Sequence, residues 1–228
     1  MATAKKEATT VNLPVLKLNR FTLKIVGDSP LISHAWSQKA KLMILNKQQK
    51  KATNGKEVRR PMVDFAESLY WLTPKPDLDG LTDEQAADVL AKIIPQSKFG
   101  FPTIGFKSAA LDGGFQQGAL AAKAGTAALA KTTARGAFQT IGEFAVIEGT
   151  PTPREDMVRI GMGTADLCYR AEFKTWRTEL EIVFNETAIS AEQIVNLFNL
   201  GGFANGVGDW RPAKDGSFGT FHVELSNG

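Results

Sequence analysis

The sequence predicts an α+β protein with a ferredoxin-like (RRM-like) β-α-β-β-α-β core, a large helical and loop insertion, and a glycine-rich loop before the last strand. Three observations predict this fold. Alternating apolar and polar residues mark strands in both halves, capped apolar-periodic segments mark helices, and a basic stretch without periodicity lies between the first strand and the later ones. The 228 residues suffice to bury one sizeable core, so we expect a single domain, 1–228.

The first half supplies a strand, a helix and the insertion. Residues 20–27 alternate as a half-buried strand, and residues 37–46 are expected to form the first core helix. A basic loop, 47–61, and an inserted helical and finger region, 62–142, follow. The segments expected within the insertion are a helix at 63–72, a helix opened by a Thr82–Gln85 capping box, a broken apolar turn at 99–106, a short helix at 107–116 and a flexible glycine- and alanine-rich finger at 113–136.

The second half of the core, residues 143–228, is expected to consist mainly of strands. A short strand is expected at 144–148, a hairpin at 157–170, and an alternating strand at 178–184. Ser190 and Gln193 form a second capping box, and Gly201 with Gly202 is expected to end the helix that begins there. A glycine-rich loop then leads to a last strand at 220–225.

Composition excludes several classes of protein. One cysteine, Cys168, allows no intrachain disulfide, and two histidines do not complete a structural zinc site. No GxxxxGK[ST] motif is present. We therefore expect no metal, no cofactor and no assigned catalytic residue. No apolar run approaches the roughly 20 residues of a membrane span, and the first residues lack the apolar segment of a signal peptide. The expected location is the cytoplasm, with the thiol reduced.

Basic residues are concentrated in the parts of the chain with the weakest periodicity. The net charge is only +3. Residues 39–60 nevertheless contain one acid, Glu57, and eight basic residues: Lys39, Lys41, Lys47, Lys50, Lys51, Lys56, Arg59 and Arg60. Residues 113–142 contain three basic residues and no acid. Flexible cations without compensating acids suit a phosphate backbone.

Three stretches resemble the RAMP superfamily, the ferredoxin-like proteins that include backbone subunits of CRISPR surveillance complexes. They are residues 29–32 (SPLI) after the first strand, residues 101–110 (FPTIGFKSAA), and the glycine-rich residues 206–212 (GVGDWRP) with 216–219 (GSFG). The pattern also resembles a group of bacteriophage-encoded proteins. This resemblance implies a sequence-tolerant binder of single-stranded DNA or RNA, self-association into filaments along the strand, and an insertion that reaches a neighbouring subunit.

The predicted nucleic-acid interface combines phosphate-binding cations with stacking aromatics. Glycine-rich backbone N–H groups would approach phosphates, and Trp210 or Trp176 would stack on bases. The alternative is a tight connection in which Trp210 covers the core. The residues expected to bind nucleic acid are Lys47, Lys50, Lys51, Arg59, Arg60, Lys107, Lys123, Lys131, Arg135, Arg159, Arg170, Trp210, Arg211 and Lys214.

Two other functions remain open from the sequence. A metal-independent ribonuclease of the RAMP type would use His34, for which no partner is evident in the sequence. A phage structural or interaction protein would bind a protein partner instead of single-stranded nucleic acid. Cys168 is expected to be a small buried apolar residue.

Overall fold

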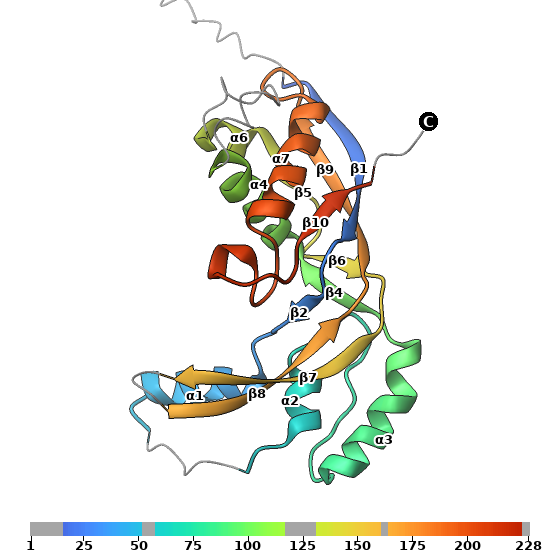
Figure 1. The fold of residues 1–228 in the computed structure, drawn as a ribbon, viewed down its shortest axis with the longest axis vertical. Coiled ribbons are helices and arrows are strands. Elements are labelled where there is room, and N and C mark those ends of the chain that lie inside the picture. The colour runs from blue at the N-terminus through green and yellow to red at the C-terminus, as the bar shows by residue number, and fades with distance from the viewer. Residues whose placement is uncertain (1–15, 52–57, 117–130, 161–163, 225–228) are drawn as a thin grey trace, which may run out of the picture.

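The computed structural model describes residues 16–51, 58–116, 131–160 and 164–224. This part of the chain is an elongated α+β molecule with antiparallel sheets. A four-stranded sheet covered by helices occupies one end, and shorter helices with a long hairpin occupy the other (Figure 1).

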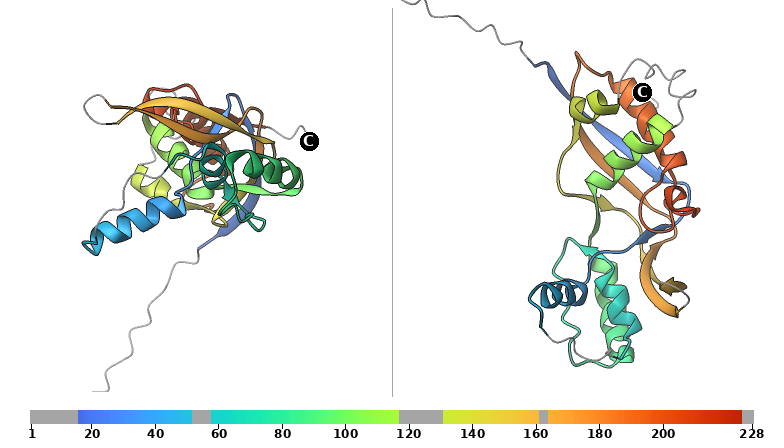
Figure 2. Two further views of the ribbon diagram at one scale, coloured as in Figure 1. Left: turned by 90° about the horizontal axis from the view of Figure 1, so that it is seen from below. Right: turned by 90° about the vertical axis from the view of Figure 1, so that its left-hand side faces the viewer.

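The four-stranded sheet contains β1 (Leu18–Gly27), β5 (Phe138–Thr140), β9 (Arg177–Asn185) and β10 (Phe221–Val223), in the order β10-β1-β9-β5. All neighbours are antiparallel, and the predicted alternation of β1 and β9 is confirmed. Helices α4 (Thr103–Gln116) and α7 (Ala191–Ala204) cover one face (Figures 1 and 2). Along the chain these elements follow one another as β1, α4, β5, β9, α7 and β10.

Glycines allow α4 and α7 to pack closely. A Cβ on Gly201 would lie 2.3 Å from the carbonyl oxygen of Ala109, and one on Gly202 would lie 2.1 Å from that of Phe221. The prediction that these two glycines end the helix is therefore wrong. The helix runs on to Ala204, because close packing of its backbone against α4 and β10 stabilises it there and requires residues without side chains.

The segment expected to be the first core helix lies elsewhere. It forms α1 (Gln38–Gln48), at the far end of the molecule from α7 (Figure 1). Of residues 41–51, only Asn46 is half-buried and the others are exposed, so α1 has no stripe that could cover a sheet. The apolar turn expected at 99–106 is instead β4 (Phe99–Pro102) followed by the first turn of α4, which takes the place next to α7.

Two three-stranded sheets complete the fold. One joins β2 (Leu31–Ser33) to the hairpin of β7 (Pro151–Ile160) and β8 (Thr164–Phe173), which is longer than predicted. The other has the order β3-β4-β6, with β3 at Tyr70–Trp71 and β6 at Phe144–Ile147. The remaining elements are α2 (Pro61–Glu67), α3 (Asp83–Ile93), α6 (Lys131–Ala137) and the 3-10 turns η1 (Ile94–Gln96) and η2 (Pro212–Lys214).

Local signals set several boundaries as predicted. The capping boxes of Thr82 with Gln85 and of Ser190 with Gln193 open α3 and α7. The helix expected at 63–72 ends early, at Glu67, because Tyr70 and Trp71 pair with β4. The finger expected at 113–136 is helical at both of its described ends, and its centre lies outside the described residues.

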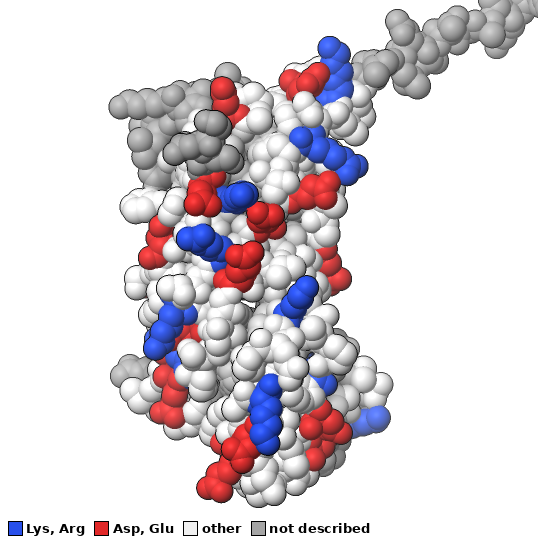
Figure 3. All heavy atoms as spheres, turned by 90° about the vertical axis from the view of Figure 1, so that its right-hand side faces the viewer, with Lys and Arg blue, Asp and Glu red and all other residues white. Residues whose placement is uncertain are grey.

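The open face of the four-stranded sheet carries paired charges. Arg20 bonds Glu181 at 2.9 Å and Lys24 lies 3.9 Å from Glu179, so basic and acidic side chains are interspersed there (Figure 3). The fully exposed positions of the four strands, as far as the structure describes them, include no Phe, Tyr or Trp. RRM proteins stack bases on aromatic side chains of this face. The described strands of this face therefore do not form a base-stacking surface of the RRM type.

Candidate nucleic-acid interface

The glycine-rich loop is held against β2 and the residues before it. The N–H of Asp209 donates to the carbonyl of Ile32 at 3.1 Å, that of Gly219 to Pro30 at 2.8 Å, and that of Val207 to Gly219 at 2.9 Å. Gly208 has a φ of +79°, and a Cβ there would lie 2.5 Å from the carbonyl oxygen of Ile32. These N–H groups serve the protein's own backbone, so the loop does not offer them to a phosphate. The glycines permit this close approach.

The same loop brings Asp209 to His34, 175 residues away in the sequence. Asp209 Oδ2 accepts hydrogen bonds from His34 Nδ1 at 2.8 Å and from Arg170 Nη1 at 3.0 Å. Burial opposes ionisation of Asp209, but the hydrogen bond from His34 and the positive charges of Arg170 and Arg211 outweigh burial and lower the pKa of Asp209. Asp209 is therefore an anion that orients the His34 ring.

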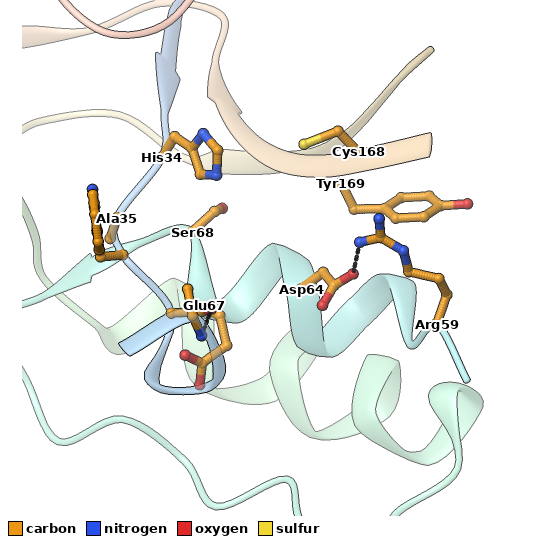
Figure 4. A pocket seen from close by; sticks show the side chains of 11 residues that line it. His34, Ala35, Arg59, Asp64, Glu67, Ser68, Cys168 and Tyr169 are labelled. Carbon is orange, nitrogen blue, oxygen red and sulfur yellow. Dashed lines mark hydrogen bonds and ion pairs between the residues drawn. The ribbon is translucent and has the colours of Figure 1, made fainter. Parts of the chain in front are cut away.

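His34 stands between two adjoining cavities. The smaller, of about 380 Å³, lies between β8 and α2, with His34 and Cys168 above Ser68 and Asp64 (Figure 4). The larger, of about 460 Å³, extends from His34 toward the glycine-rich loop and includes Tyr70, Arg211 and Lys214. The lining thus joins β8, α2, the glycine-rich loop and the residues after β2, segments that are far apart in the sequence.

Two of the residues predicted to bind nucleic acid, Lys107 and Arg170, point into the protein. The Lys107 ammonium, in a residue that is 5% exposed, donates to the carbonyls of Arg135 and Phe138 and to Gln139 Oε1 at 2.7–3.0 Å. Arg170 is 4% exposed; it bonds Asp209 and Cys168 Sγ and lies 3.8 Å from Asp156. Both charged groups are buried against internal partners, so in this structure neither is available for the predicted phosphate contact.

Other predicted cations have internal partners but remain partly accessible. Arg59 pairs with Asp64 and Asp166, and Lys131 pairs with Asp112. Arg60 donates to the carbonyls of Leu78 and Leu81. Arg211 donates to the carbonyl of Gly208. Such pairing lowers the gain from a phosphate contact, because the existing partner must be given up.

The exposed predicted residues lie in three places. Lys47, Lys50 and Lys51 lie at the end of α1, whereas Lys214 and Trp210, which is 41% exposed, lie by the glycine-rich loop. Arg135 is exposed on α6. Lys123 lies outside the described residues, and only the backbone of Arg159, in β7, is described. Trp176 is 2% exposed and donates from Nε1 to the Ser29 carbonyl, so it is not available for stacking.

Comparisons with known proteins add little to this geometry. No family model matches the chain, and no curated protein matches it. Among solved structures, the crystal structure of Cmr6 from Pyrococcus furiosus matches with a TM-score of 0.36 and 11% identity, over 92% of this chain and 100% of that one. At this TM-score the likeness supports no functional conclusion.

Sequence reasoning missed the partner of His34, and it missed Trp36 and the cavity in which Trp36 and Tyr169 meet. Trp36, which precedes α1, and Tyr169 of β8 both line the cavity that His34 also lines. Trp36 and His34 are near in sequence, but only the pairing of β2 with β8 brings Tyr169 into the same cavity. Within the described residues, no three His, Cys, Asp or Glu side chains are grouped as metal ligands, and no helix has the length and hydropathy needed to cross a membrane.

Proposed function

We propose that this protein binds single-stranded nucleic acid without strong sequence preference and self-associates along the strand. The observation that carries the proposal is the lysine-rich segment of α1. Residues 37–56 contain six lysines and no acid. Lys41, Lys47, Lys50 and Lys51 are all exposed, and none forms an ion pair with another described residue. Because the neighbouring arginines are paired, these lysines are the cations best placed to release counterions from a phosphate backbone.

We infer that the core is ferredoxin-like. In support, its elements follow the order β-α-β-β-α-β with both helices on one face of an antiparallel sheet. The open face of that sheet is occupied by charge pairs. We therefore place the bound nucleic acid at the other end of the molecule, along α1 and past the two cavities at His34.

Self-association is supported by the apolar part of α1. Leu42, Met43, Ile44 and Leu45 are 40–57% exposed on a helix of 11 residues. An isolated helix of this length is marginal in water, and packing against other parts of a protein is what normally stabilises a helix. A neighbouring subunit on the strand would supply that burial for α1.

The salt dependence of binding tests this proposal. Affinity for a fluorescently labelled single strand should fall with a slope of about −0.7 in log K against log salt for each phosphate neutralised. Four lysines acting together would give a slope of about −3. Fluorescence anisotropy measures the slope, and light scattering on the same samples measures assembly. A protein that stays monomeric and ignores strands at low salt would refute the proposal and favour a protein partner.

A second candidate function is metal-independent RNA cleavage at His34, because Asp209 orients this imidazole as a general base requires. His222 provides a matched control, since it is equally exposed and bonds Asp28 at 2.6 Å. If His34 is catalytic, His34→Ala should abolish the release of products with 2′,3′-cyclic phosphate ends, and His222→Ala should not. Intact RNA after long incubation with wild-type protein would eliminate this candidate.

A further inference from the structure

The smaller cavity has features of a site for a flat heterocycle. Trp36 is 66% exposed at its edge, and Tyr169 lines it from β8. Figure 4 shows His34 at one end of the cavity and Tyr169 at the other, with α2 beneath. A volume of about 380 Å³ is within the usual range for small-ligand sites and leaves room for one base with its sugar.

The Tyr169 ring is anchored by a neighbour on the adjacent strand. Glu155 lies opposite Tyr169 in the register of β7 and β8. Its carboxylate accepts a hydrogen bond from the Tyr169 hydroxyl, which raises the pKa of this tyrosine. With its hydroxyl held by Glu155, the tyrosine is left with its ring as the part that can contact a ligand.

The lining includes polar groups, most of which are already used by the protein. Ser37 Oγ caps α1 by accepting from the N–H of Ala40. Ser68 Oγ donates to the Phe65 carbonyl and accepts from the N–H of Ala171. Arg59 is paired with Asp64 and Asp166. His34 differs, because its Nδ1 bonds Asp209 and, among the residues that the structure describes, its Nε2 has no hydrogen-bond partner.

The hydrogen bond to Asp209 determines whether His34 Nε2 acts as a donor or an acceptor toward a ligand. The carboxylate of Asp209 can only accept, so Nδ1 carries the proton in the bond between them. In the neutral imidazole Nε2 is then an acceptor. An acceptor at this position pairs with an N–H donor, such as the exocyclic amino group of cytosine or adenine, and not with the carbonyl that uracil or thymine presents at the same position.

The cavity also adjoins the cations that bind the phosphates in the proposed function. Trp36 immediately precedes Ser37, the N-cap of α1. Lys41 follows Ser37 by four residues, about one helical turn, or roughly 5.4 Å along the axis. A strand held by Lys41 therefore passes next to the cavity and can direct one base into it.

We infer that this cavity takes one unstacked nucleobase per subunit, stacked on Trp36, bounded by Tyr169, and contacted at its amino group by His34 Nε2. The inference rests on the proposed function, because the phosphate contacts of α1 bring the strand to the cavity. Beyond the proposed function, the inference predicts that part of the affinity for single-stranded nucleic acid depends on the bases, with a mild preference among them.

Oligonucleotides with and without bases test whether a base stacks on Trp36. The probes are a labelled oligodeoxycytidine and an abasic strand of equal length and charge, with affinities measured by fluorescence anisotropy. Wild-type protein should bind the base-containing strand roughly tenfold more tightly. Trp36→Ala should remove this difference and leave abasic binding unchanged, and it should fold normally because Trp36 is exposed. Trp210→Ala, at an exposed tryptophan outside the cavity, is the matched control and should keep the difference.

A comparison of oligodeoxycytidine with oligodeoxyuridine tests the amino-group contact. Wild-type protein should prefer cytosine about fivefold, the value of one hydrogen bond. His34→Ala should abolish this preference, and His222→Ala should not.

Equal binding of base-containing and abasic strands by wild-type protein would overturn the cavity inference while the proposed function stands. The cavity inference would also be overturned if Trp210→Ala, and not Trp36→Ala, removed the difference between the two strands. Failure to bind either strand would overturn the proposed function itself.

Discussion

Replacing Lys47, Lys50 and Lys51 together with alanine is expected to weaken single-strand binding on the order of 100-fold at about 50 mM salt. All three side chains are exposed at the end of α1, and none has an acidic partner among the described residues. The substitution should therefore remove phosphate contacts without breaking an internal pair. The slope of log K against log salt should become shallower by about 2.

The matched control removes three other lysines. Lys92, Lys98 and Lys174 are also exposed and line neither cavity, so their replacement by alanine lowers the net charge equally. We expect that triple variant to change affinity only severalfold. The loss in the α1 variant should be the same for all strand sequences, because phosphate contacts carry no base information. Equal losses in both variants would mean that net charge, and not α1, governs binding.

Replacing Lys107 with methionine is expected to lower the free energy of unfolding by about 3 kcal/mol. The change keeps the length of the side chain but removes the donor that serves two backbone carbonyls and Gln139 Oε1. Buried acceptors left without a donor cost about 1–3 kcal/mol each, and the amide of Gln139 can turn to relieve part of this cost. Thermal unfolding should shift down by roughly 6–12 °C for a domain of this size.

Strand binding distinguishes the structural role of Lys107 from the predicted phosphate contact. Affinity per folded molecule should stay unchanged in Lys107→Met, because the ammonium lies between α6 and β5. Lys92→Met, at an exposed helical lysine, should change neither stability nor affinity. Normal stability with lost affinity in Lys107→Met would show that the ammonium faces the strand.

Local signals in the sequence predicted many of the elements. The alternation of Leu180, Ile182 and Phe184 predicted β9, and the capping boxes at Thr82 and Ser190 predicted the starts of α3 and α7. These signals depend on contacts within a few residues, namely the period of apolar side chains and the hydrogen bonds of a helix N-terminus. The absence of acids from residues 37–56, which carries the proposed function, can likewise be read from the sequence.

Long-range packing decided which helix lies beside α7 in the core. Residues 37–46 and 103–116 both form helices, but only α4 has glycines and small residues that allow close approach to α7. The sequence shows those glycines without showing what they face. Gly201 and Gly202 therefore resemble a helix terminator until the backbones of Ala109 and Phe221 are placed beside them.

By itself the sequence determined where strands and capped helices lie along the chain and where its uncompensated lysines fall. The tertiary structure alone decided which polar groups are still available for a ligand. Arg170 and Lys107 look like any other cations in the sequence, yet one is held by Asp209 and the other by carbonyls about 30 residues away. The physical reason is that burying a charge is unfavourable unless partners satisfy it, and those partners are brought together only when distant segments fold against one another.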